Sequence, residues 1–224
     1  MEAQMKFTLT YDGDLPSAGN GNKRTKEKQQ IREHLSPQLA ELWRISPSLQ
    51  YALTNRYVAK QGGYLSGGIH HLAQPEEHYP FVPNAAQRDH FIDLCEEVER
   101  GDFKFLPLVR RNYGTICGLK ILFMRQESEG KVVQGGDLDN RIKTLLDALT
   151  LPNTDQLASA PPSGNVSQPI HCLLEDDAMV SSLSVETRRL LTRPDARNSE
   201  VRLVIDVDVR VPDVRDYNTL FLGD

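Results

Sequence analysis

The sequence predicts an α/β (α+β) fold in which helices pack on a mixed β-sheet. Apolar and polar residues alternate over residues 5–11 and 201–211, which is typical of half-buried strands. Over residues 139–149 the apolar side chains instead recur with the period of a helix. Both patterns occur in a chain of 224 residues, which is long enough to bury a sizeable core. We therefore expect strands and helices to share one core.

After its first strand, the N-terminal part of the chain is predicted to be mainly helical. The strand at 5–11 ends in an Asp-Gly-Asp turn, and a polar helix is expected over 25–35. Serine followed by proline, a common helix start, occurs at 36–37 and again at 46–47, so we expect a new helix at each. Residues 62–83 contain Gly-Gly pairs and prolines, which favour a loop.

Residues 84–100 are predicted to form another helix. Asn84 is a suitable N-cap, and Phe91, Cys95 and Val98 recur at i, i+4 and i+7. A glycine follows at the point where such a helix would stop.

The second half of the chain is predicted to alternate between strands and one regular helix. The helix covers 139–149, and the predicted strands are 106–109, 115–123, 180–187 and 201–211. Residues 151–170 are small, polar and rich in proline, so we expect a flexible loop insertion there.

Composition and charge exclude several classes of protein. The chain is 39% hydrophobic and 25% charged, and no apolar run reaches the length of a membrane span, so a soluble globular protein is expected. The first residues do not resemble a secretory signal, which favours a cytoplasmic location. Three widely spaced cysteines do not indicate a disulfide framework or a zinc site, and none of the six histidines has a metal-ligand spacing.

Charge is unevenly distributed along a chain whose net charge is −5. Basic residues outnumber acidic ones by 8 to 3 over residues 20–60, whereas acidic residues outnumber basic ones by 8 to 5 over 131–190. One interpretation is a phosphate-binding surface beside a cation site. The alternative is that both stretches are ordinary solvated faces.

Two groups of carboxylates in the acidic stretch are candidates for a metal site. Asp137 and Asp139 lie at the start of the helix predicted over 139–149, and Asp176 and Asp177 lie just before the strand predicted over 180–187. Clustered carboxylates repel one another unless a cation lies between them, and Mg²⁺ and Mn²⁺ prefer oxygen ligands. Each pair also has a structural explanation, because aspartate suits helix N-termini and turns.

Lys143 is a candidate catalytic cation on the same helix. Asp139, Lys143 and Asp147 are spaced by four residues and therefore form one stripe at the border of the apolar face. In that position Lys143 would place positive charge beside a bound metal. The alternative is a weak ion pair with one of the two aspartates.

The residues that carry these features resemble the signature of a known family. The string GDLDNRIKTLLDALT at 136–150, followed by LEDDAMV at 174–180, is similar to the signature of RusA-type Holliday junction resolvases. The pattern D-x-D-N-x-x-K-x-x-x-D-A-L with a downstream Asp-Asp pair is far more specific than D-x-D alone. The order of the predicted strands at 5–11, 115–123 and 201–211 is also similar.

The resemblance implies a homodimeric endonuclease of DNA recombination and repair that resolves four-way junctions by paired symmetric nicks. It implies that Mg²⁺ or Mn²⁺ is the cofactor and that the metal activates water for phosphodiester hydrolysis. Asp137, Asp139 and Asp177 would be the metal-binding catalytic carboxylates, Asp176 a supporting ligand, and Lys143 the essential lysine.

Relative to this family, residues 1–224 are expected to form a single domain with residues 25–102 as a helical insertion or appendage. The basic residues over 23–32, which we call the basic arm, and one arginine of the motif are expected to contact branched DNA. These residues are Lys23, Arg24, Lys26, Lys28, Arg32 and Arg141.

Two other functions remain open from the sequence. One is a branched-DNA-binding module of the same fold that does not cleave. The other is a D-x-D metal-dependent transferase acting on a non-DNA substrate, although the downstream Asp-Asp pair would then have no explanation.

Overall fold

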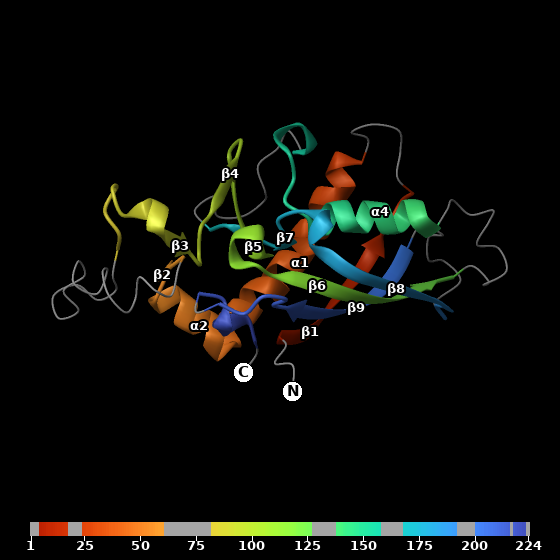
Figure 1. Cartoon of the computed structure of the whole chain (residues 1–224). Coiled ribbons are helices and arrows are strands. Elements are labelled where there is room, and N and C mark those ends of the chain that lie inside the picture. The colour runs from red at the N-terminus through yellow and green to blue at the C-terminus, as the bar shows by residue number, and fades with distance from the viewer. Residues whose placement is uncertain are drawn as a thin grey trace.

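The computed structural model confirms the predicted mixture of helices and mixed β-sheet (Figure 1). The residues that the structure describes are 5–17, 24–60, 82–126, 138–157, 168–191, 200–215 and 217–222. None of the described helices is long and apolar enough to cross a membrane.

The described residues form a four-stranded main sheet with the strand order β1-β9-β6-β8. Strand β9 pairs antiparallel with β1 and β6, whereas β8 pairs parallel with β6, so the sheet is mixed. The strands are β1 (Met5–Asp14), β6 (Ile116–Arg125), β8 (Val180–Arg189) and β9 (Glu200–Arg210). Each contains one of the strands predicted from the sequence, apart from an end residue or two.

Smaller sheets lie beside the main one. In the larger of them, β5 pairs antiparallel with β4 and parallel with β7. A second pairing joins β2 to β3. The strands are β2 (Tyr57–Ala59), β3 (Phe91–Asp93), β4 (Val98–Arg100), β5 (Phe103–Val109) and β7 (Ile170–Leu174).

Helix α1 (Thr25–Ile45) is continuous, so the predicted restart at Ser36 and Pro37 is wrong. Pro37 is tolerated inside the helix because the same turns bury an apolar stripe that includes Leu35 and Leu39. Ser36 is not a helix cap, since its Oγ accepts a hydrogen bond of 2.9 Å from the backbone N–H of His171.

Helix α2 (Pro47–Thr54) begins where the second serine-proline pair predicts a helix start. The Ser46 side chain caps it by accepting a hydrogen bond from the N–H of Leu49.

The prediction of a helix over residues 84–100 is wrong. This segment forms a short 3₁₀ turn, η1 (Arg88–His90), followed by β3 and β4. Asn84 does cap, but it caps a turn, because its Oδ1 accepts hydrogen bonds from the backbone N–H groups of Ala86 and Gln87. The apolar spacing that fits a helix also fits a strand, a turn and a second strand, and Phe91 and Ile92 are both buried at neighbouring positions.

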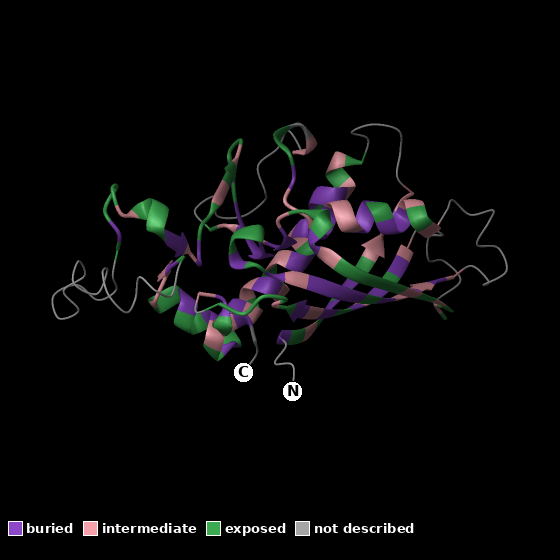
Figure 2. Ribbon diagram, in the orientation of Figure 1, coloured by how far each residue is buried: buried purple, intermediate pink, exposed green. Residues whose placement is uncertain are grey.

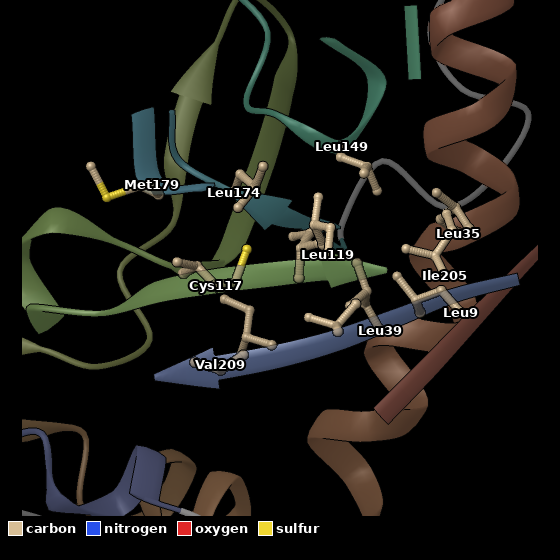
Figure 3. Close-up of a cluster of buried hydrophobic side chains, with 14 of the residues drawn as sticks. Leu9, Leu35, Leu39, Cys117, Leu119, Leu149, Leu174, Met179, Ile205 and Val209 are labelled. Atoms are coloured by element: carbon tan, nitrogen blue, oxygen red, sulfur yellow. The ribbon is translucent and has the colours of Figure 1, made fainter. Parts of the chain in front are cut away.

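Helices α1 and α4 (Leu138–Leu149) contribute to one hydrophobic core with the main sheet (Figure 2). Figure 3 shows Leu35 and Leu39 of α1 beside Leu9 of β1 and Ile205 of β9. Helix α1 is therefore an integral part of the core, although it lies within the predicted appendage at 25–102.

Short 3₁₀ turns connect the main elements: η2 (Arg111–Tyr113), η4 (Thr154–Gln156), η5 (Asp177–Met179) and η6 (Thr219–Leu222). Turn η4 lies in the predicted loop insertion at 151–170, whose residues 158–167 are outside the described residues.

Candidate active site

Helix α4 presents two residues of the acidic motif to solvent. Its apolar face, with Leu145 and Leu149 at 0% and 1% exposure, is buried in the core. Asp139 and Lys143 are exposed one turn apart. Within the described part of the chain, neither of these two side chains makes a hydrogen bond or an ion pair. Asp137 directly precedes α4 and lies outside the described residues.

Asp147, the third member of the predicted stripe, fastens α4 to α1. Its Oδ2 lies 2.6 Å from Nζ of Lys28, and its backbone carbonyl accepts a hydrogen bond of 2.7 Å from Nη2 of Arg32. Lys28 is 8% exposed and Arg32 only 2%. Burial lowers the pKa of Arg32 to about 10, against the opposing effects of Cys172 and Asp147. Asp147 is therefore a partner of buried cations and is not available as a metal ligand.

In the second acidic group, Glu175 and Asp176 make structural contacts, whereas the Asp177 carboxylate makes none among the described residues. Glu175 Oε2 accepts a hydrogen bond of 2.9 Å from the backbone N–H of Arg111 and lies 3.8 Å from Nε of the buried Arg110. Asp176 caps η5, since its Oδ1 accepts a hydrogen bond of 2.8 Å from the N–H of Ala178. Asp177 is exposed, and its carboxylate makes no hydrogen bond or ion pair among the described residues.

The structure places Asp139 near the start of α4 and the second acidic group at the other end of this helix. The N–H of Leu151 donates to the carbonyl of Leu174 at 2.8 Å, which joins the C-terminal end of α4 to the strand that leads into Asp176 and Asp177. Asp139 lies ten residues before Leu149, or about 15 Å along the helix axis. In the described ranges, no three histidine, cysteine or acidic residues are grouped so that they could hold a metal ion. Among the described residues, Asp139 is therefore not brought close to Asp176 and Asp177, and Asp137 lies outside these residues.

The predicted DNA-binding residues that the structure describes are divided between the surface and the interior. Arg24 is paired with Glu27 at 3.1 Å, and Lys26 is exposed. Three further cations face the interior, namely Lys28, Arg32 and Arg141, with exposures of 8%, 2% and 7%. Lys23 lies outside the described residues. Lys28 and Arg32 are spaced by one helical turn on the side of α1 that packs on α4, so they act as interior cations of the fold.

A polar hollow that the sequence did not predict lies on one face of the main sheet. It has a volume of about 580 Å³, and its lining includes Lys6, Lys120, Arg210, Asp206 and Asp208. The residues come from neighbouring strands in register, because Lys6 pairs with Asp208 and Asp206 pairs with Lys120 across the sheet. The polar residues of the alternating strand pattern indicate which face of the sheet is exposed, but they do not show that this face contains a hollow.

The floor of the hollow is set by a glycine. A Cβ at Gly118 would lie 2.7 Å from the Oγ of Ser182, so a larger residue would fill the space. The charges that line the hollow are of both signs and oppose each other across strands. The hollow therefore has no strong preference for an anion or a cation.

Comparison of the chain with protein-family models, curated proteins and solved structures finds no match.

Proposed function

We propose that this protein is a Mg²⁺-dependent, structure-selective endonuclease that resolves four-way DNA junctions, as the resemblance to RusA-type resolvases implies. The observation that carries the proposal is the division of the motif on α4. Asp147 and the apolar residues have structural partners, whereas Asp139 and Lys143 are exposed and have none among the described residues. Charged side chains without a structural task are the ones available to a substrate or an ion.

The donor set at the start of α4 fits a magnesium ion in its simplest protein site. Mg²⁺ is usually held by one or two carboxylates, while waters and substrate phosphates complete its octahedron. Asp137 and Asp139 flank Leu138 at this point of the chain, and we assign both as ligands. A bound ion supplies a water of lowered pKa and balances charge on the scissile phosphate.

Lys143 has the role of an electrostatic partner for the substrate. It lies one helical turn after Asp139 on the exposed side of α4. An ammonium group there stabilises negative charge that develops on a phosphate held at the helix start. Mn²⁺ would serve in place of Mg²⁺, because both ions prefer carboxylate and water oxygens.

The partner in the proposal is a second copy of the chain. A four-way junction offers two symmetric strands, and a dimer with twofold symmetry presents two matched sites to them. Paired nicking by such a dimer is the proposed reaction.

The test is cleavage of a labelled synthetic four-way junction by the wild type and by matched variants. Asp139→Asn and Lys143→Met should lose nicking while the proteins stay folded, because both side chains are exposed. Asp89→Asn, an exposed aspartate on η1, is the matched control and should cleave like the wild type. Cleavage by Asp139→Asn at the wild-type rate would refute the assignment. Junction binding without cleavage by the wild type would favour the non-cleaving module instead.

Asp177→Asn addresses the second acidic group in the same assay. Loss of nicking in both Asp139→Asn and Asp177→Asn would assign both ends of α4 to the reaction. Loss in Asp139→Asn alone would confine the site to the start of the helix.

A further inference from the structure

The edge strand β8 has the properties of a protein interface. Among the described residues it pairs with β6 alone, and no described strand lies against its other edge, which we call the open edge. Most of its ten residues are exposed, as the colouring of Figure 2 shows, and Leu183 is 44% exposed. Proline and charge are the usual features that prevent an edge strand from pairing with another chain. Residues 180–185 carry neither, and residues 186–189 carry charges of both signs.

The opposite edge of the same sheet is protected. The Gln38 side chain of α1 accepts a hydrogen bond of 3.0 Å from the backbone N–H of Thr10 in β1. The same amide donates a hydrogen bond of 2.8 Å to the Thr10 carbonyl. Gln38 thus forms hydrogen bonds with both backbone groups of Thr10. Among the described residues, no side chain does the same at the open edge of β8.

The backbone of β8 determines which residues a second strand would meet. The N–H of Leu190 donates to the carbonyl of Arg125 in β6, so even-numbered residues of β8 direct their backbone groups toward β6. Odd-numbered residues, including Thr187, therefore direct theirs toward the open edge. A second β8 running antiparallel would form hydrogen bonds with these positions.

One register of such a pair brings opposite charges together and places two exposed leucines opposite each other. Within one chain, Glu186 and Arg188 are paired at 2.6 Å. If Thr187 lies on the twofold axis, Glu186 of each copy also faces Arg188 of the other copy, at the closely spaced positions of the ladder. In the same register Leu183 faces Leu191, and both are exposed large apolar residues, at 44% and 87%. A register centred on Glu186 would instead place the two glutamates opposite each other.

We propose that two copies of this chain associate through antiparallel pairing of their β8 strands about Thr187. The main sheets of the two copies then form one continuous sheet. This inference rests on the proposed function only for the expectation of a dimer, to which it gives an interface. Its test uses neither DNA nor metal, so it fails or holds separately from the nuclease assignment.

The first experiment is sedimentation equilibrium of the full chain with charge-reversal variants. Glu186→Arg and Arg188→Glu each place like charges opposite one another twice per dimer, so each should raise the dissociation constant of the dimer by about tenfold. The double variant restores opposite pairs and should return to the wild-type value. A monomeric wild type, unaffected single variants, or a double variant as weak as the singles would overturn the proposal.

Disulfide cross-linking tests the register directly. Facing residues of an antiparallel pair have Cα atoms about 5.5 Å apart, within disulfide range, so Thr187→Cys should form a covalent dimer on mild oxidation. Leu183→Cys is the control, because its two copies would be about 27 Å apart along the strands. The native Cys95, Cys117 and Cys172 are buried, which keeps the background low. Cross-linking of Leu183→Cys in preference to Thr187→Cys would overturn the register.

Discussion

Removal of the Asp147 carboxylate should destabilise the protein more than removal of any exposed carboxylate on α4. Asp147→Ala leaves the Lys28 ammonium without its partner at 2.6 Å, and the Lys28 side chain is only 10% exposed. Loss of one partner of a buried ion pair costs about 3–5 kcal/mol, because the remaining charge stays buried. Because the Asp147 side chain is 28% exposed and water reaches the pair, we expect the lower end, about 3 kcal/mol.

The assay is urea unfolding followed by circular dichroism, supported by thermal melts. A loss of about 3 kcal/mol corresponds to a fall in Tm of roughly 6–12 °C for a chain of this size. Asp139→Ala is the matched control on α4 and should cost no more than about 1 kcal/mol, from its interaction with the helix dipole. An Asp147→Ala protein whose free energy of unfolding lies within about 0.5 kcal/mol of the wild type would refute the reasoning.

Three further predictions follow from burial. Leu145→Ala should lower the free energy of unfolding by about 2–5 kcal/mol in the same urea assay, because Leu145 is fully buried at 0% exposure between α4 and the sheet. Burial lowers the pKa of His171 below 6.5, despite the opposing effects of the Pro169 backbone and Glu97, so the unfolded chain binds a proton more readily. Stability should therefore fall as the pH drops below about 6.5, less steeply in His171→Gln; equal slopes between pH 5 and 7 would contradict this. Burial, and then Asp14, raise the pKa of Tyr11 to about 12, so stability should decline from about pH 10 upward, with a smaller decline in Tyr11→Phe.

Periodicity in the sequence predicted the helices and strands that bury only one of their faces. Strands β1 and β9 alternate because one face packs on the core, and α4 has a single apolar stripe. Strand β7 was missed because its sequence, IHCLL, is a short and largely apolar run, as in strands buried on both faces. The segment 84–100 was assigned to the wrong element because its apolar spacing fits two periods at once.

Residue type alone did not predict which charges of the candidate site are internal. The periodicity of α4 predicts Asp139 and Lys143 at the border of the apolar face, and in the structure both are exposed. It does not show that Lys28 and Arg32, which are distant in sequence, reach Asp147 across the interface with α1. Lysine and arginine are rarely buried, so the basic arm was interpreted as a surface. Only the packing of α1 on α4 assigns them to the interior.

The most direct test of the proposed function is the rate of nicking of a four-way junction by the wild-type protein, beside a linear duplex of the same sequence. With Mg²⁺ present, the proposal predicts paired nicks in the junction and little cleavage of the duplex. In EDTA it predicts that nicking of the junction is lost. Equal cleavage of the two substrates, undiminished cleavage in EDTA, or no cleavage with either Mg²⁺ or Mn²⁺ would contradict it.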